Sequence, residues 1–229
     1  MPVDPQLQRK LIGEVARCMV GHAEELTTLD QAIGDGDHGL NMKRGFEAVL
    51  AELDKTAALP MHEALKAVGM TLVMKVGGAS GPLYGTLLMT LGKAFPELPT
   101  RAGVAQAFAA AVDAVKARGK SDVQMKTMLD VLVPVLVTLK GGGEDVYARL
   151  RASAESAAAA TVPMQAVRGR ASFLGARSVG HMDPGARSSW LMVQTVADVL
   201  EEAEGLRPSP PGRRDGDEGR FCLTPPSNR

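Results

Sequence analysis

The sequence predicts an all-α protein, in which eight helices are joined up and down by short connections. Apolar residues recur at three- and four-residue spacings in one segment after another, and glycine or proline separates these segments. No strand-like alternation lies between them, which argues against a parallel-sheet fold. Hydrophobic residues make up 45% of the chain but aromatic residues only 3%. Because alanine, leucine, valine and methionine dominate, the composition also favours helix over sheet.

The first four helices share an apolar stripe that stops at a polar, glycine-rich or proline-containing stretch. They are predicted over residues 6–29, 41–53, 61–72 and 82–91. Asn41 is placed to cap the second helix. Pro82 fits the first turn of the fourth, where a missing N–H costs nothing.

The last four helices are predicted over residues 101–118, 126–136, 145–162 and 186–203. Gly119 and Lys120 end the fifth helix, and Pro134 is expected to kink the sixth. Residues 164–184 are less regular. The helices form one domain, residues 1–204, and the polar stretch over residues 205–229 has almost no apolar content, so we expect a disordered tail.

The composition also limits the classes of partner. The 229 residues carry a formal net charge of zero, so neither nucleic acid nor an anionic membrane is expected as a partner. The sequence contains no targeting segment and no run of about 18 apolar residues. Cys18 and Cys222 make neither a disulfide framework nor a zinc site. We therefore expect a cytoplasmic protein.

Three carboxylates crowd into the stretch between the first two helices. Asp30, Asp35 and Asp37 lie within eight residues among several glycines, so a loop can fold back until their oxygens converge. Three like charges that close repel unless a cation neutralises them, and oxygen-only ligands favour Mg²⁺ or Ca²⁺ over zinc. The spacing excludes an EF-hand loop. An acidic loop alone is more often a solvated turn, so the metal site depends on what lies near it.

A second polar connection, residues 77–82, contains three glycines and a proline. Such a stretch inside a helix would cost several kcal/mol (roughly 1 per Gly and about 3 for Pro), so it must be a turn. Small residues leading into a helix expose backbone N–H groups at the positive end of the helix dipole, which makes this turn a candidate anion site. The alternative is a plain tight turn between two helices.

The order of the polar connections predicts that they meet. In an up-and-down bundle every second connection lies at the same end. The acidic loop, the glycine-rich turn, Gly119 with Lys126 and Thr127, and the segment with Arg177 and Asp183 therefore converge. Metal ligands, anion-binding N–H groups and cations in one place are what a site for Mg-nucleotide phosphates requires.

Three blocks of the sequence resemble the nucleotide-binding L subunit of dihydroxyacetone kinase. They are GDGDHGLNM at 34–42, GGASGPLYGT at 77–86, and GRASFLG at 169–175 followed by GHMDPG at 180–185. The resemblance spans about residues 5–203 with the blocks in order. It implies an eight-helix antiparallel up-and-down barrel with ADP or ATP and two Mg²⁺ ions at one end. Met125 and Ala176 depart from it, since acidic residues often stand there in the family.

The resemblance also implies roles for single residues. Asp30, Asp35 and Asp37 would bind magnesium. The residues that it places around the nucleotide are His38, Gly39, Leu40, Asn41, Ala79, Ser80, Gly119, Met128, Arg177, Asp183, Pro184 and Gly185. Lys126 and Thr127 join this cofactor-binding set through their place among the converging connections. Arg177 and His38 are the candidate catalytic residues, because charge on a transferred phosphoryl group must be neutralised.

The partners follow from the same resemblance. In the phosphotransferase-system version of the family, the L subunit keeps ADP as a bound coenzyme. A phospho-carrier subunit (M-type) rephosphorylates that ADP, and a K subunit presents dihydroxyacetone on a histidine. Stand-alone kinases fuse K and L domains and use free ATP, and 229 residues leave no room for a K domain. We further expect a homodimer. Two alternatives stay open: a subunit acting on another short ketose, and a non-catalytic nucleotide-binding partner of a transcription regulator.

Overall fold

The computed structural model describes residues 2–205, and these form helices without any strand. The elements are α1 Pro5–Gly21, α2 Ala23–Ile33, α3 His38–Ala51, α4 Leu53–Ala57, α5 Met61–Lys75, α6 Ser80–Ala94, α7 Arg101–Gly119, α8 Leu129–Gly141, α9 Val146–Ala160, the 3-10 helix η1 Arg170–Ser178, and α10 Pro184–Ala203. The predicted all-α class is confirmed. Of the predicted tail, only Gly205 lies within the described residues, so its disorder stays a prediction.

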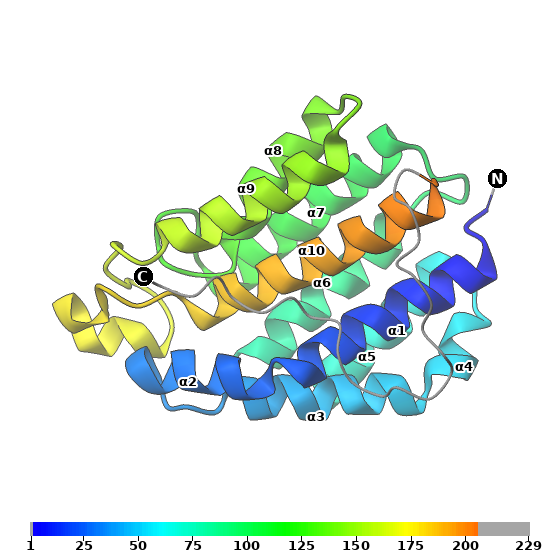
Figure 1. Ribbon diagram of the computed structural model, residues 1–229. Coiled ribbons are helices and arrows are strands. Elements are labelled where there is room, and N and C mark those ends of the chain that lie inside the picture. The colour runs from blue at the N-terminus through cyan, green and yellow to red at the C-terminus, as the bar shows by residue number, and fades with distance from the viewer. Residues whose placement is uncertain (1, 206–229) are drawn as a thin grey trace.

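The long helices lie alongside one another (Figure 1), and their contacts close a ring. α1 packs against α3, and α3 against α5; the ring continues through α6, α7, α8 and α9 to α10, which packs back against α1. Buried apolar side chains from around the ring fill its centre, among them Met19, Phe46, Leu72, Val115 and Leu129. Because the ring closes, residues far apart in the sequence face each other at its ends.

The first predicted helix is in fact two helices. α1 ends at Gly21 and α2 begins at Ala23, and His22 between them has φ −98° and ψ 13°, outside the helical range. α2 continues to Ile33, past the predicted end at residue 29, so Asp30 lies in the last turn of a helix and not in the loop. The sequence pattern missed this because glycines follow the aspartate so closely.

Other boundaries differ by a few residues. α3 begins at His38 and not at Asn41, and the short α4 follows it. α8 begins at Leu129 and not at 126, because Lys126 has a left-handed backbone (φ 59°) that a helix cannot contain. Pro82 lies in the first turn of α6, as predicted. None of the helices in residues 2–205 is long and apolar enough to cross a membrane.

Candidate nucleotide and metal site

Four helices, α3, α6, α8 and α10, begin at the same end of the ring (Figure 1). His38 in the first turn of α3 lies 3.0 Å from Ser80 Oγ of α6 through Nδ1, and 3.0 Å from Ser188 Oγ of α10 through Nε2. A Cβ on Gly185 of α10 would stand 3.5 Å from the backbone nitrogen of Met128, which precedes α8. We call this end the rim (residues 30–41, 77–82, 119–130 and 161–188). Its four helix N-termini give it a positive backbone field.

The three aspartates meet at the rim. Oxygens of Asp30, Asp35 and Asp37 lie within 4.8 Å of one another. Asp30 is buried, and its Oδ2 accepts the N–H groups of Asp37 (2.9 Å) and His38 (3.1 Å), so it also caps α3. Gly34 has no room for a side chain, because a Cβ there would stand 2.0 Å from Asp30 Oδ1. The glycine therefore lets the loop fold back over the carboxylate.

This cluster fits a hard divalent cation. Its donors are all carboxylate oxygens, the ligands that Mg²⁺ prefers, and their converging charges favour a bound cation. Arg170 Nε lies 2.9 Å from Asp35 Oδ2, but the arginine side chain is 71% exposed. Exposed pairs of this kind contribute little free energy, so Arg170 does not replace a metal ion. Asp30, Asp35 and Asp37 could hold the ion.

His38 is buried at the centre of the rim. Burial lowers the pKa of its imidazole below the ordinary value, although the negative charges of Asp30 and Asp37 oppose this effect. The ring is therefore neutral near pH 7 and can donate through only one nitrogen.

A chain of hydroxyl groups surrounds His38. Ser188 Oγ lies 2.9 Å from the carbonyl oxygen of Pro184, to which it can only donate. When it does so, it accepts from His38 Nε2–H, and His38 Nδ1 accepts from the Ser80 hydroxyl. Tyr84 OH lies 2.7 Å from Ser188 Oγ. His38 thus joins α3, α6 and α10.

The turn before α6 is built against Asn41. Gly77 has no room for a side chain, because a Cβ would stand 2.6 Å from Asn41 Oδ1, and Gly78 has a left-handed φ of 64°. Ala79, at the N-cap of α6, is exposed and makes no side-chain cap. The first N–H groups of α6 are therefore not capped by the residue before them.

Two further residues of the predicted set lie at the start of α3. Gly39 is buried against α2, where a Cβ would stand 1.9 Å from the carbonyl oxygen of Ala23. Leu40 is 62% exposed. Gly39 therefore provides close packing between helices, whereas Leu40 is open to a ligand or partner.

Asp130 stabilises the connection between α7 and α8 through hydrogen bonds to its backbone. Its carboxylate is buried and accepts the N–H of Thr127 (2.7 Å) and the N–H of Gln124. Gly119 ends α7, and the buried Met128 is the N-cap of α8, whose first N–H, on Leu129, donates to Thr127 Oγ1 (3.2 Å). Thr127 and Met128 are thereby held at the start of that helix.

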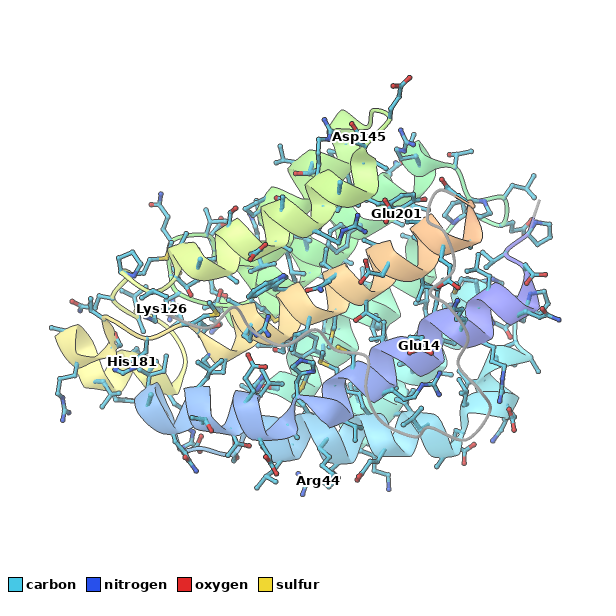
Figure 2. All side chains as sticks on the ribbon, in the orientation of Figure 1. Glu14, Arg44, Lys126, Asp145, His181 and Glu201 are labelled. Atoms are coloured by element: carbon cyan, nitrogen blue, oxygen red, sulfur yellow. The ribbon has the colours of Figure 1, made fainter. Side chains whose placement is uncertain are left out.

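Lys126 has partners other than those the sequence predicts. Its side chain is 1% exposed, and Nζ donates to the carbonyl oxygens of His181 (2.6 Å), Ser178 (2.7 Å) and Met164 (3.0 Å). Figure 2 places Lys126 and His181 at the same end of the molecule. An ammonium group has three N–H donors, so these contacts use all of them.

Asp183 begins α10. Its carboxylate accepts the N–H of Ala186 (2.7 Å), and Pro184 follows at the first helical position. Burial raises the pKa of Asp183 to about 7, and the nearby charges of Asp130 and Asp30 act in the same direction. A carboxyl group with such a pKa changes its charge near neutral pH.

The remaining predicted residue, Arg177, is exposed at the end of η1. The sequence did not identify Arg170, Tyr84, Ser188 or Asp130, which hold or border the site. Arg170 and Tyr84 lie inside the sequence blocks that resemble the family, and this position could have identified them as site residues. Ser188 meets His38 only because the ring closes.

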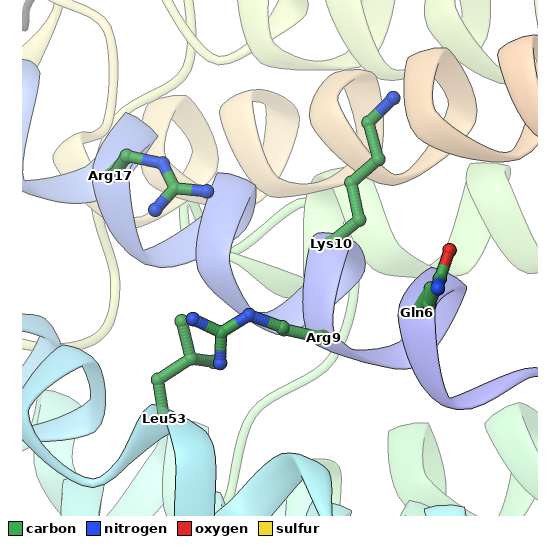
Figure 3. A pocket seen from close by; sticks show the side chains of 5 residues that line it. All are labelled: Gln6, Arg9, Lys10, Arg17 and Leu53. Atoms are coloured by element: carbon green, nitrogen blue, oxygen red, sulfur yellow. The ribbon is translucent and has the colours of Figure 1, made fainter. Parts of the chain in front are cut away.

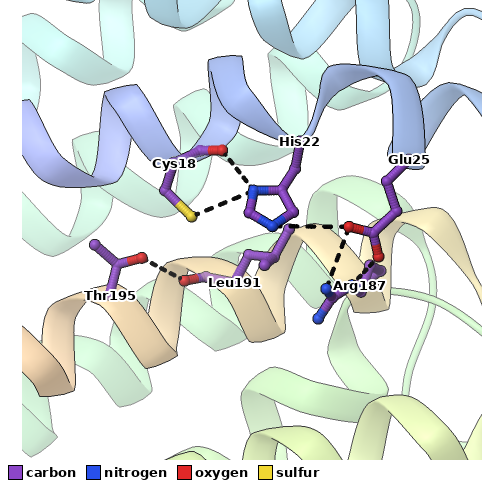
Figure 4. Close-up of polar contacts among 6 residues, drawn as sticks. All are labelled: Cys18, His22, Glu25, Arg187, Leu191 and Thr195. Atoms are coloured by element: carbon purple, nitrogen blue, oxygen red, sulfur yellow. Dashed lines mark hydrogen bonds and ion pairs between the residues drawn. The ribbon is translucent and has the colours of Figure 1, made fainter. Parts of the chain in front are cut away.

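A polar cluster fixes α2 against α10 (Figure 4). Glu25 of α2 accepts from Arg187 of α10 through Nε (2.5 Å) and Nη2 (3.2 Å), and the guanidinium lies 4.0 Å from the centre of the Trp190 ring. His22 Nδ1 lies 3.0 Å from the carbonyl oxygen of Cys18. The cluster therefore sets the helix that carries Asp30 against the helix that follows Asp183.

A separate hollow of about 490 Å³ lies along α1 (Figure 3), lined by Gln6, Arg9, Lys10, Arg17 and Leu53. Each of its three cations pairs with a carboxylate of the described chain. None of the predicted site residues borders it, so it is not part of the rim site.

The chain also matches a known protein family. The family model for the DAK2 domain matches residues 32–198. The PEP-dependent dihydroxyacetone kinase ADP-binding subunit DhaL of Escherichia coli K12 is 46% identical over 204 residues, which cover 84% of this chain and 97% of that protein. The PTS-dependent counterpart from Lactococcus lactis is 39% identical, covering 76% of this chain and 87% of that protein.

The fold also has a solved counterpart. The dihydroxyacetone kinase of C. freundii, crystallised with AMP-PNP and Mg²⁺, superposes with a TM-score of 0.69 at 23% identity. The match covers 86% of this chain and 34% of that longer one, and it supports the fold. This chain belongs to the DAK2 domain family, among the ADP-binding L subunits of dihydroxyacetone kinases.

Proposed function

We propose that this chain is the ADP-binding subunit of a PEP-dependent dihydroxyacetone kinase. In this role it passes a phosphoryl group, carried on its nucleotide, to dihydroxyacetone on a separate K subunit. The observation that carries the proposal is the aspartate cluster at the same end as the start of α6, where the N-cap residue Ala79 makes no side-chain hydrogen bond. The names and near-complete coverage of the bacterial relatives support it.

The nucleotide phosphates would lie between the aspartates and the helix starts. Asp30, Asp35 and Asp37 would hold two Mg²⁺ ions, which supply charge neutralisation for phosphoryl transfer when bound. Backbone N–H groups near Ser80 and Met128 would donate to phosphate oxygens. The exposed Arg177 would neutralise charge that develops during transfer.

His38 contributes by holding the site together. Its two nitrogens contact Ser80 and Ser188, so it fixes the start of α6 relative to α10. Because the Ser80 hydroxyl donates its one hydrogen to His38 Nδ1, a phosphate near Ser80 would be bound by the backbone N–H groups at the start of α6. We propose that His38 acts on the phosphates by fixing the start of α6, whose first backbone N–H groups would donate to them.

The partners and location belong to the same proposal. A phospho-carrier subunit would rephosphorylate the bound ADP, and the K subunit would receive the phosphoryl group at the rim. The protein would work in the cytoplasm, where phosphoenolpyruvate is available and the buried Cys18 would stay a thiol. The proposal also includes a homodimer and a contact with a transcription regulator.

The experiment combines binding with transfer. ADP binding is measured by calorimetry with Mg²⁺ and with EDTA. Transfer is then measured with the K subunit, the carrier, phosphoenolpyruvate and dihydroxyacetone, with Arg177→Ala beside the wild type. We expect Mg²⁺-dependent binding, and product that requires both partners and falls at least 100-fold in Arg177→Ala. Tight binding without any transfer would contradict the proposal and favour the regulatory role; faster turnover of another short ketose would change the substrate.

A further inference from the structure

Lys126 combines two features that folding normally avoids. Its ammonium-bearing side chain is almost completely buried, and its backbone has a left-handed φ of 59°. Lysine is rarely buried unless its charge is satisfied, and left-handed backbone is uncommon for residues other than glycine, asparagine and aspartate. Such a residue persists only where its surroundings hold it in place.

Carbonyl oxygens satisfy the buried ammonium. The three shortest contacts, to His181, Ser178 and Met164, use its three N–H donors, and the Val162 carbonyl lies farther away at 3.5 Å. We call these four carbonyls the cage. Burial lowers the pKa of Lys126, and the charge of Asp183 opposes this effect. The ammonium therefore has no donor left for a phosphate.

The cage spans the segment that carries the predicted catalytic arginine. Met164 precedes η1, Ser178 directly follows Arg177, and His181 stands two residues before Asp183. One ammonium thus joins both ends of the connection between α9 and α10. Bonds within the connection reinforce this, because Ser178 Oγ accepts from the N–H of Ala166 (2.9 Å).

The other side of Lys126 is equally fixed. Asp130 on α8 accepts the N–H of Thr127, the next residue, and the N–H of Gln124. The backbone N–H of Val167 donates to the carbonyl oxygen of Met125 (3.4 Å). The loop before α8 and the segment before α10 are therefore one unit, with the Lys126 ammonium at its centre.

We infer that Lys126 is a positioning residue, which sets Arg177 and the start of α10 over the nucleotide phosphates through the cage and does not itself touch the nucleotide. The expected effect on the nucleotide rests on the proposed function, whereas the hydrogen bonds of the cage do not. It differs from the sequence-based expectation, which placed Lys126 at the nucleotide.

The test compares Lys126→Met, which keeps the length of the side chain without the charge, with Lys120→Met. Lys120 is an exposed lysine in the same connection, also with a left-handed backbone (φ 48°), and serves as the matched control. In apo protein we expect amide hydrogen exchange of residues 162–183 to become at least tenfold faster in Lys126→Met and to stay unchanged in Lys120→Met. Exchange in α5 and α6 should not change in either. Unchanged exchange in residues 162–183 would overturn the cage whether or not the protein binds ADP.

The second readout separates positioning from direct contact. Lys126→Met should weaken Mg-ADP binding at least tenfold, and this loss should shrink at least threefold when measured in an Arg177→Ala background. Losses that are fully additive would overturn the inference, because a direct phosphate contact acts independently of Arg177. Lys126→Arg keeps the positive charge and serves as a second variant in case Lys126→Met does not fold. Its larger planar group cannot replace the compact ammonium, so we expect faster exchange of residues 162–183 and weaker ADP binding; full ADP affinity together with faster exchange would contradict positioning.

Discussion

Asp30 has two roles that the structure separates by atom. Its Oδ2 accepts two backbone N–H groups at the start of α3, as a cap would. Its other oxygen can join Asp35 and Asp37, whose carboxylates are more exposed. The three aspartates are therefore not equivalent, and substitution should reveal the difference.

Asp35→Asn and Asp37→Asn should leave the apo protein as stable as the wild type, or slightly more stable, because each removes one of three repelling charges. Asp30→Asn should lower apo stability by about 1 kcal/mol, because it weakens a charge-assisted cap. All three should lose most of the stabilisation by Mg-ADP, about 2.7 kcal/mol for a 100-fold loss of affinity at saturating ligand. Thermal melts with EDTA and with Mg-ADP measure both effects, and Asp113→Asn on the exposed face of α7 is the control. Equal losses in both conditions for all three variants would mean that the aspartates only stabilise the fold.

Asp183 should make the apo protein less stable as the pH rises. Its folded pKa, about 7, lies above the ordinary value near 4, so between these values the folded state binds more protons than the unfolded state. The free energy of unfolding therefore falls as the pH rises through that range. Asp183→Asn removes this pH dependence. The free energy of unfolding of the variant, relative to that of the wild type, should therefore rise by about 2 kcal/mol from pH 5 to pH 8. Urea unfolding in EDTA at both pH values provides the measurement, and parallel pH dependences would contradict a buried, protonated Asp183.

At the scale of helices, the site depends on how closely α2 and α3 approach each other. A Cβ on Gly39 would stand 1.9 Å from the carbonyl oxygen of Ala23 and 2.3 Å from Thr27 Oγ1, both on α2. The same two helices carry Asp30 and His38. Any separation of α2 from α3 would therefore move a metal ligand away from its neighbours.

Gly39→Ala should lower the free energy of unfolding by about 2 kcal/mol through overpacking, and should weaken Mg-ADP binding more than tenfold. Gly21→Ala is the control, because nothing lies within 4 Å of a Cβ at the end of α1, and alanine there should be neutral or add about 0.5–1 kcal/mol. Denaturant unfolding and calorimetry provide the two readouts. Wild-type ADP affinity in a destabilised Gly39→Ala protein would show that the α2–α3 distance does not control the site.

The sequence predicted helices well where an apolar stripe was long, and less well where a polar side chain decided a boundary. Breakers such as Pro60 and Pro82 marked real helix starts. The helix breaks at His22, whose imidazole contacts the Cys18 carbonyl oxygen, and α2 extends through Asp30, whose carboxylate accepts the Asp37 N–H. Apolar periodicity does not show either contact.

At the scale of the whole molecule, the alternating polar connections correctly predicted a common rim. The contacts that organise it were not predictable, because they cross the closed ring: His38 meets Ser188, 150 residues away, and Lys126 meets His181, 55 residues away. Helical periodicity gives the faces of single helices but not which helix closes the ring. The residues of the recognised blocks met as expected, while Lys126 acquired partners that only the three-dimensional arrangement provides.

The central claim is that this subunit holds its nucleotide while phosphoryl groups pass through it. The most direct measurement loads the protein with adenine-labelled ADP and Mg²⁺, then adds carrier, phosphoenolpyruvate, K subunit and dihydroxyacetone, with excess unlabelled ADP in solution. A cofactor held at nanomolar affinity, about 12 kcal/mol, would leave slowly compared with turnover. We predict many product molecules per subunit while the label stays on the protein. Label that exchanges with the unlabelled ADP at each turnover would contradict the claim and show that the nucleotide is a substrate that comes and goes, as in an ordinary ATP-dependent kinase.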